Sequence, residues 1–502
     1  MTIKEAKRHI EDTVKVYLTK DEFGRYVVPV ERQRPVFLLG APGIGKTAIM
    51  EQIARELDIA LVSYSMTHHT RQSALGLPQI VKKNYGGEEF SVSEYTMSEI
   101  LVSVYDVIEK SGKKEGILFL DEINCVSETL APIMLQFLQY KTFGRHRVPD
   151  GWIVVTAGNP PEYNNSVREF DVVTWDRLKK ITVDPDFDAW REYAGNAGVH
   201  PAVLSYLETK RANFYSIENT PDGKSFVTAR GWDDLSRMLH LYEQLDIPAD
   251  ISLIVQYIQS PRIARDFAGY YDLFRKYRSD YRIDSILDGS YEEIMLNRAK
   301  AARFDERLSL IGMIADSLFN DSAVVARELK LQKMTADALG KLHADISVGC
   351  SPEEAVQRMS ERTQKELDVR RAAGSLDWEL QRCNDILMSR TADYLREVSG
   401  VSDGAVAFMK IKEKFMSEMK AADKLAEKVR SKLSCAFRFL DEAFGDGQEM
   451  VFFVTQLTIN TSTSAFITRY GCDEYFAHNK GLCFHDRQKE LMERIRKTSP
   501  EK

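Results

Sequence analysis

The stretch that decides the fold is residues 35–47, Pro35-Val36-Phe37-Leu38-Leu39-Gly40-Ala41-Pro42-Gly43-Ile44-Gly45-Lys46-Thr47. Its first half is a short apolar run that ends in glycine, which predicts a buried parallel strand. Its second half has the spacing G-x-x-x-x-G-K-T, and a helix is predicted from Thr47 to Leu57. Glycines let backbone N–H groups turn inward around phosphate oxygens, and the positive end of the helix dipole faces the same anion. Residues 35–47 therefore predict a strand, a phosphate-binding loop and a helix in succession.

Each polar residue of this loop has a predicted task. Lys46 is expected to reach the β and γ phosphates of a nucleoside triphosphate, and Thr47 to ligate Mg²⁺. The alternative is a chance match in a glycine-rich turn, which the flanking strand and helix disfavour. The predicted nucleotide contacts are Gly40, Ala41, Pro42, Gly43, Ile44, Gly45, Lys46, Thr47 and Ala48.

Strands and helices are predicted to alternate through the first part of the chain. A helix from Ile3 to Leu18 comes first, and helical segments separate the strands. This alternation predicts an α/β fold, a parallel sheet flanked by helices. The further strands are expected at residues 60–65, 117–120, 152–157 and 180–183.

Two adjacent carboxylates follow one of these strands, in Gly116-Ile117-Leu118-Phe119-Leu120-Asp121-Glu122. Two carboxylates at one strand end repel each other unless a cation lies between them. We expect Asp121 to hold Mg²⁺ beside Thr47, and Glu122 to activate the attacking water as general base. The alternative is an exposed turn at the end of a strand.

The next predicted strand ends in an amide, Asn159, which precedes Pro160. Its side chain is placed to hydrogen-bond the γ-phosphate or the attacking water. The alternative is an asparagine that only starts a turn. Its position one strand after the acidic pair favours the first hypothesis.

The chain has 502 residues, which is long enough for about three domains. We expect a nucleotide-binding domain at 1–184, a small helical lid at 185–261 and a large α-helical region at 262–502. No strand is predicted after Pro185. Residues 353–398 mix charged and apolar positions at near-heptad spacing, which fits either a long helical arm or an ordinary bundle helix.

Composition places the chain among globular proteins, with 44% hydrophobic and 28% charged residues. The net charge of −7 gives no basic footprint for nucleic acid. The N-terminus lacks the apolar core of a signal peptide, and we expect no apolar run of bilayer length. The six cysteines are scattered, which favours a cytoplasmic location.

Four motifs together resemble the AAA+ ATPases, and within them the MoxR branch with its RavA-like and CbbQ/NorQ-like proteins. They are Gly40–Thr47, Leu118–Asn124, Ala157–Pro160 and Asp176-Arg177. The resemblance covers about the first 260 residues and implies ATP as the nucleotide, with Mg²⁺.

The resemblance also implies roles for further residues. Asn159 matches the sensor asparagine, and Arg177 matches the arginine that reaches a neighbour's nucleotide. Arg168 is a second candidate for that contact, and Arg230 looks like the lid arginine that senses nucleotide. For Arg177 the alternative is a surface arginine near a helix end, and for Arg230 it is an arginine at a helix start that faces solvent.

Two predicted hairpins, at 78–92 and 140–149, also resemble this branch, in which such hairpins face the channel of a ring and meet the client. The alternative is two ordinary surface hairpins. The first is expected inside the second helix. The chain departs from the branch at Leu178, where phenylalanine is common, and in lacking an asparagine on the second strand to restrain Glu122. Ser63 and Ser65 are the candidates to replace that asparagine.

The resemblance implies a homo-oligomeric ring, with six subunits as the family expectation, that remodels or matures a protein client. A protein with a von Willebrand factor A domain is the implied partner. The alternatives are a nucleic-acid-linked motor of the McrB-like clade and a nucleotide-gated scaffold without turnover. In the last part of the chain the spacing of Cys472, His478, Cys483 and His485 fits no common zinc site.

Overall fold

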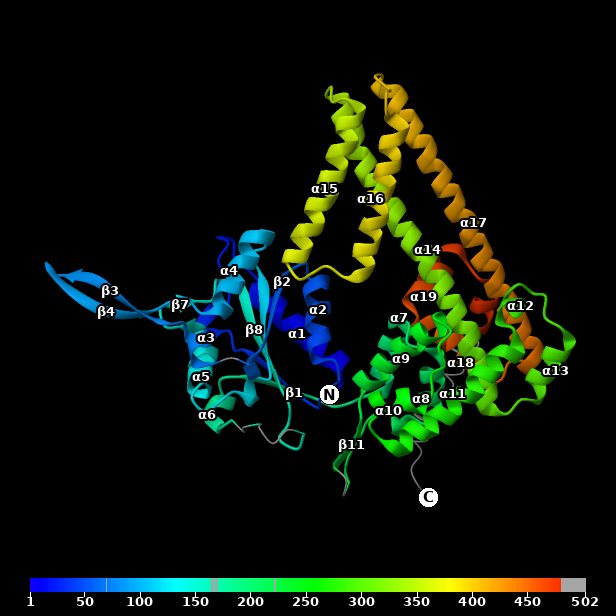
Figure 1. Ribbon diagram of the computed structural model, residues 1–502, viewed down its shortest axis with the longest axis horizontal. Helices are drawn as coiled ribbons and strands as arrows, with labels where there is room; N and C mark the ends of the chain where they lie inside the picture. The colour runs from blue at the N-terminus through cyan, green and yellow to red at the C-terminus, as the bar shows by residue number, and fades with distance from the viewer. Residues whose placement is uncertain (69, 164–166, 168–169, 221–222, 480–502) are drawn as a thin grey trace, which may run out of the picture. The chain divides into compact units, whose positions relative to one another are not determined.

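The computed structural model describes residues 1–479 except 69, 164–166, 168–169 and 221–222 (Figure 1). The chain forms two compact units. Unit 1 consists of Met1–Ala189 with Ser360–Met388, and unit 2 of Trp190–Met359 with Ser389–Lys502. The division into 1–184, 185–261 and 262–502 stays a prediction.

Unit 1 is built on a five-stranded parallel sheet with the order β2-β5-β8-β1-β9. The predicted α/β fold with a helix-flanked parallel sheet is confirmed, and so is the helical C-terminal region described below. The strands are β1 (Val36–Gly40), β2 (Ala60–Ser65), β5 (Gly116–Asp121), β8 (Trp152–Gly158) and β9 (Lys179–Val183).

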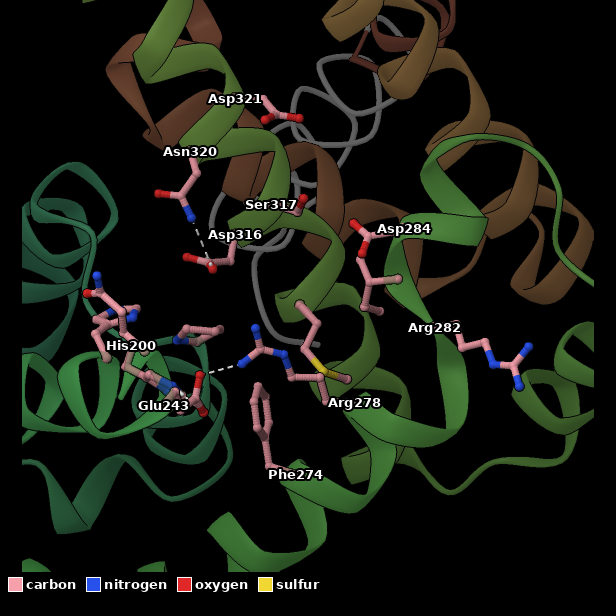
Figure 2. A pocket seen from close by; sticks show the side chains of 15 residues that line it. His200, Glu243, Phe274, Arg278, Arg282, Asp284, Asp316, Ser317, Asn320 and Asp321 are labelled. Atoms are coloured by element: carbon pink, nitrogen blue, oxygen red, sulfur yellow. Dashed lines mark hydrogen bonds and ion pairs between the residues drawn. The ribbon is translucent and has the colours of Figure 1, made fainter. Parts of the chain in front are cut away.

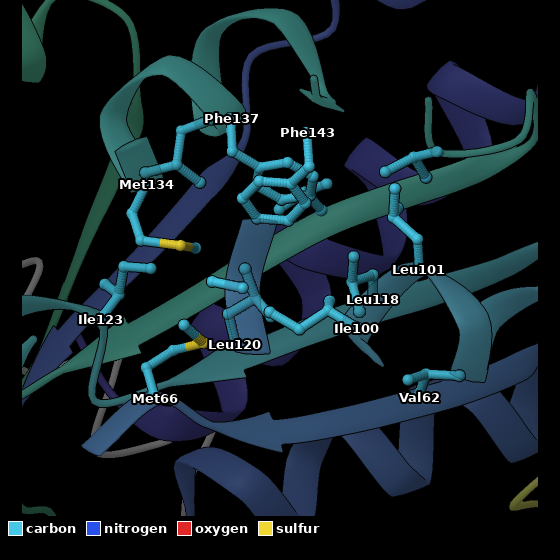
Figure 3. Packing of buried hydrophobic residues seen from close by; sticks show 14 of the residues in the cluster. Val62, Met66, Ile100, Leu101, Leu118, Leu120, Ile123, Met134, Phe137 and Phe143 are labelled. Carbon is cyan, nitrogen blue, oxygen red and sulfur yellow. The ribbon is translucent and has the colours of Figure 1, made fainter. Parts of the chain in front are cut away.

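Side chains alternate along these strands and fill a core on each face of the sheet. Ile117 and Phe119 of β5 pack on one face with residues of α1 and α2, while Leu118 and Leu120 pack on the other. Figure 3 shows this second face, where the rings of Phe137 and Phe143 stack with centroids 4.1 Å apart. The helices of unit 1 are α1 (Ile3–Leu18), α2 (Lys46–Glu56), α3 (Arg71–Leu75), α4 (Glu99–Ser111), α5 (Ala131–Tyr140) and α6 (Val172–Trp175).

Both hairpins predicted in this unit are present. β3 (Pro78–Tyr85) pairs with β4 (Glu88–Tyr95) across Gly86 and Gly87, whose φ angles of 63° and 97° suit a tight turn. This hairpin lies between α3 and α4, so its predicted place inside a helix was wrong. The second hairpin pairs β6 (Thr142–Phe143) with β7 (His146–Arg147).

Unit 2 is mostly helical. Its longest helices, α14 (Phe304–Ser347) and α17 (Gly404–Phe444), pack against each other. The other helices are α7 (Phe187–Ala197), which begins in unit 1, α8 (Pro201–Thr209), α9 (Ala229–Gln244), α10 (Ile251–Tyr257), α11 (Pro261–Tyr281), α12 (Ile283–Leu287), α13 (Glu293–Ala301), α18 (Gln448–Ile459) and α19 (Thr461–Tyr470).

The prediction that strands stop at Pro185 was wrong. β10 (Ser216–Thr220) and β11 (Gly223–Val227) form an antiparallel pair in unit 2. Ile217 faces Phe226 across this pair, and Phe226 also bridges to Gln259. The strands are short and polar, so their alternation is weak beside the long helical patterns around them.

Residues 353–398 form two helices, α15 (Pro352–Ala372) and α16 (Trp378–Val398). Gly374, with φ of 65°, ends the first helix through a bond from its N–H to the Arg371 carbonyl. The turn between the two helices belongs to unit 1.

Within the described part of the chain, α14 is long and apolar enough to cross a membrane by length and composition, and α18 with α19 passes as one bent pair. The prediction that no apolar run reaches bilayer length was therefore wrong for α14 by length and composition. In its most apolar window, 56% is buried inside the protein, which fits a helix of the core.

Candidate nucleotide site

The carboxyl ends of three neighbouring strands bring the predicted site residues together in unit 1. β1 leads into the loop of residues 40–47, β5 ends at Asp121, and β8 is followed by Asn159. These strands are adjacent in the sheet, so one edge collects residues that lie more than 100 positions apart. Ligands of open parallel sheets bind at this edge.

The loop itself depends on glycine. Gly43 and Gly45 have φ angles of 74° and 93°, a region that side-chain-bearing residues rarely adopt. Gly45 immediately precedes α2, so the first free N–H groups of that helix face the loop. A Cβ atom on Gly40 would lie 2.8 Å from the carbonyl oxygen of Val183. The predicted strand–loop–helix unit is therefore the one observed.

Lys46 is buried, with 8% of its surface exposed. Its Nζ donates to the carbonyl oxygens of Gly40 and Ala41 at 2.8 and 2.9 Å, and to Asn159 Oδ1 at 2.8 Å. These three acceptors are neutral, so a phosphate oxygen would be a stronger partner for the ammonium group. The contact also places the Asn159 side chain beside Lys46, while its predicted bond to the γ-phosphate or the attacking water stays a prediction.

Thr47 and Asp121 lie together as a metal site requires. The Thr47 hydroxyl donates to Asp121 Oδ2 at 3.1 Å, and Asp121 Oδ1 accepts from the Glu122 amide at 2.9 Å. Mg²⁺ in nucleotide sites takes one or two protein oxygens and completes its shell with phosphates and water. The two side chains fit that role, and no group of three or more His, Cys, Asp or Glu side chains that could hold a metal occurs among residues the structure describes.

Glu122 has an unusual backbone. Its φ of 57° places a non-glycine residue in the left-handed region, at a cost of about 1–3 kcal/mol. Its Oε2 accepts from the Ser65 hydroxyl at 3.2 Å. Of the two serines named as candidates, Ser65 is therefore the one in contact with Glu122.

A contact missed from the sequence lies beside Asn159. Asn124 is 4% exposed and donates from Nδ2 to the Asn159 carbonyl at 2.8 Å. A Cβ atom on Gly158 would lie 2.3 Å from Asn124 Oδ1, so only glycine fits there. Asn124 belongs to the motif of residues 118–124, but the motif does not indicate which residue its side chain contacts.

Cys125 is close to the acidic pair and is not suited to act as a nucleophile. Burial raises the pKa of its thiol, and the charges of Glu122 and Asp121 raise it further. The thiol therefore stays protonated near neutral pH.

The structure describes two of the three arginines that were predicted to act at the site. Arg177 is exposed on unit 1, two residues after the end of α6. Arg230 is exposed in the first turn of α9, in unit 2. Arg168, Cys483 and His485 lie outside the described residues. The roles of these arginines stay predictions.

Unit 2 contains a separate cavity of about 500 Å³ (Figure 2). Its lining includes His200, Glu243, Arg278 and Asp316, whereas the residues of the phosphate loop lie in unit 1. Glu243 accepts hydrogen bonds from His200 at 3.1 Å, from Tyr271 at 3.1 Å and from Arg278.

Comparisons with known proteins agree with the geometry of unit 1. Residues 35–178 match the family model for the AAA domain of the dynein-related subfamily. No curated protein matches the chain.

Two solved structures are similar at 16% identity each, a candidate ATPase from Cytophaga hutchinsonii and NtrX from Brucella abortus. The first match covers 38% of this chain and 54% of the other, with a TM-score of 0.23. The second covers 43% and 48%, with a TM-score of 0.22. The chain thus spans about half the length of these proteins.

The family match coincides with the phosphate loop, the acidic pair and the amide at one sheet edge. Residues 35–178 are therefore similar to an AAA domain, and this match covers the part of the chain that holds the candidate nucleotide site.

Proposed function

We propose that this chain hydrolyses ATP with Mg²⁺. The observation that carries the proposal is the contact of Lys46 with Asn159 and of Thr47 with Asp121, next to Glu122, at one edge of the sheet. A scaffold that only binds nucleotide needs no carboxylate placed to activate water.

Each side chain has a task in this proposal. Lys46 exchanges its neutral acceptors for phosphate oxygens, and Thr47 and Asp121 would hold Mg²⁺, which neutralises charge on the phosphates. Glu122 accepts a proton from the attacking water as that water bonds to the γ-phosphorus. The bond from the γ-phosphorus to the bridging oxygen breaks, and ADP leaves with that oxygen. Asn159 donates from its amide nitrogen to the γ-phosphate or the water.

We further propose that the active form is a homo-oligomeric ring, of six subunits by family expectation. Arg177 would reach the nucleotide of a neighbouring copy, and Arg230 would sense nucleotide from the lid. Val172 and Val173 of α6 support an interface at this place, because their side chains are 83% and 58% exposed just before Arg177.

The work done with this energy is proposed to be MoxR-like, the remodelling of a protein client in the cytoplasm. A protein with a von Willebrand factor A domain is the proposed partner. The β3–β4 hairpin supports contact with a client, since Ile80 and Phe90 are 78% and 47% exposed on it.

Phosphate release from ATP tests the activity. We expect turnover with Mg²⁺ that stops when the metal is chelated, and Lys46→Ala should lose both nucleotide binding and turnover. Turnover unchanged in Lys46→Ala would reject this site. Strong stimulation by DNA would favour the McrB-like alternative over a protein client.

Mixed rings test the interface. Light scattering with saturating ATP and Mg²⁺ should show an oligomer, and a persistent monomer would contradict the ring. Arg177→Ala and Lys46→Ala subunits are each expected to be inactive alone. Mixing them should restore part of the turnover, because an intact Arg177 then meets an intact loop.

A further inference from the structure

The edge strand of the five-stranded sheet contacts a turn that lies more than 300 residues later in the sequence. β2 is the edge strand, paired on one side with β5. On its other side the Leu61 amide donates to the Ala373 carbonyl at 3.2 Å. We call residues 373–377 the tip loop; it joins α15 to α16 and lies beside β2 and α2 (Figure 1).

The tip loop is shaped for this contact. Ala373 is fully buried and Ser375 is 4% exposed. Gly374 has a φ of 65°, and a Cβ atom on it would lie 3.0 Å from the Leu61 carbonyl oxygen. Glycine is therefore required both by the turn and by the close approach to the strand.

A second contact ties the tip loop to α2. Arg55, in the last turn of α2, has its Nη1 3.1 Å from Asp377 Oδ2. The other oxygen of Asp377 caps α16 by accepting from the Leu380 amide at 2.6 Å. One carboxylate thus fixes both the start of α16 and the end of the helix that begins at Lys46.

The opposite end of β2 contacts Glu122, the proposed general base. Ser65 is the last residue of β2, four residues after Leu61, and it donates to Glu122 Oε2. Four residues of strand span about 13 Å. β2 is already paired with β5 along its length, and the bond to Ala373 restrains its other side as well.

We propose that the tip loop is a positioning element for ATP hydrolysis, since it fixes β2 and thereby the Ser65 hydroxyl that orients Glu122. This inference rests on the proposed function of Glu122. A misplacement of about 1 Å at a reacting group costs up to about 100-fold in rate. The tip loop itself touches neither nucleotide nor water, so it acts only through β2.

Two variants release the tip loop in different ways. Arg55→Gln removes the ion pair and keeps the Asp377 cap, and Gly374→Val adds atoms against Leu61. The Arg55 and Asp377 side chains are 36% and 31% exposed, so loss of this pair changes stability little. We expect each variant to lower kcat about five- to twentyfold, with KM for ATP and nucleotide affinity within about twofold.

Two comparisons separate positioning from general damage. Arg55→Lys should restore most of kcat, and in the Ser65→Ala background the tip variants should change kcat less than about twofold, because both act on one path. The matched control is Asp368→Asn, in an exposed ion pair with Arg371 on the same pair of helices; it should leave kcat unchanged. Additive effects of the tip variants and Ser65→Ala would overturn the proposal.

Amide hydrogen exchange provides a readout that needs no turnover. In Gly374→Val and Arg55→Gln, exchange should increase at residues 61–66 and 122–126 and stay unchanged in α4. Unchanged exchange and unchanged kcat in an active enzyme would overturn the role of the tip loop. Absence of turnover in the wild type, with exchange still increased, would overturn the proposed function and leave the mechanical link supported.

Discussion

Two partly exposed carboxylates, Glu122 of unit 1 and Glu243 of unit 2, differ in the groups that surround their charge. Glu243 accepts from His200, Tyr271 and Arg278. Burial raises its pKa, but the hydrogen bond and charge of His200 and the charge of Arg278 outweigh burial and lower the pKa to about 2. Glu122 accepts from the neutral hydroxyl of Ser65, and no cation pairs with it in the described part of the chain.

The difference separates a structural carboxylate, Glu243, from Glu122, which is proposed to react. A carboxylate with several donors and a cation is already satisfied, and its charge stabilises the folded state. A carboxylate with one neutral donor keeps its lone pairs for a proton or a water. Strained backbone at Glu122 fits the same contrast, since strain collects where chemistry is done.

Replacing the Glu122 carboxylate by an amide is expected to change turnover more than any other substitution proposed below. Glu122→Gln keeps the shape and removes the base, so turnover should fall by about 10³-fold with nucleotide binding retained. Phosphate release and binding of a fluorescent ATP analogue measure the two properties. The urea midpoint should not move, and turnover above a tenth of the wild-type rate would reject Glu122 as the base.

Glu243→Gln should show the reverse pattern. It leaves His200 and Arg278 without their carboxylate and should lower the free energy of unfolding of unit 2 by about 2–3 kcal/mol. Urea unfolding followed by circular dichroism measures this. Turnover at low temperature should stay within about twofold.

The control on the same helix is Asp234→Asn. Its partner Arg237 is 64% exposed, so this pair should contribute less than about 0.5 kcal/mol. If both substitutions lowered the free energy of unfolding equally, the Glu243 cluster would stabilise unit 2 no more than an exposed ion pair does.

Glycine-to-alanine substitutions in the two units should have smaller effects, of opposite sign, on stability. At Gly158 the added Cβ meets Asn124 Oδ1 at 2.3 Å, so Gly158→Ala should destabilise unit 1 by about 1–3 kcal/mol and reduce turnover by displacing Asn159. At Gly269 of α11 the Cβ meets nothing within 4 Å, so Gly269→Ala should stabilise unit 2 by up to about 1 kcal/mol. Changes of the same sign in thermal denaturation would contradict this account.

The sequence was sufficient for parts of the fold that depend on local pattern. The apolar runs of the parallel strands, the loop at Gly40–Thr47 and the turn at Gly86-Gly87 each carry their own structural information. The neighbours that complete the site are non-local. The bond from Ser65 to Glu122 spans 57 residues, and no spacing rule chooses Ser65 over Ser63.

Other contacts were beyond reach for the same reason. The contact of Leu61 with Ala373 joins segments more than 300 residues apart, and nothing near Ala373 marks it as the partner of a strand edge. The pair β10–β11 was missed because polar strands of five residues carry little periodic signal. The contact between Asn124 and Gly158 could not be predicted from the sequence, because it depends on distances that differ by tenths of an ångström.

The smallest expected effect concerns pH, where the two units should respond at opposite ends of the scale. In unit 2 the pKa of Glu243 is lowered from 4.5 to about 2. The stability it contributes is present above pH 4.5 and is lost as pH falls toward 2. In unit 1 Lys141 is 2% exposed, and burial together with the charge of Arg147 lowers its pKa to about 8.

For a lysine this direction means that folding is penalised while the amine is charged. The penalty is complete below about pH 8 and fades as pH rises toward 10.5. Lys141→Met should therefore be more stable than the wild type at pH 7, by an amount on the order of 1 kcal/mol after the lost bond to Gln33 is allowed for. The advantage should shrink by pH 9.5, as thermal denaturation at both pH values can measure. An advantage that grows with pH would mean that Lys141 is stabilised in its charged form, and unit 1 would then bury a paired charge as unit 2 does.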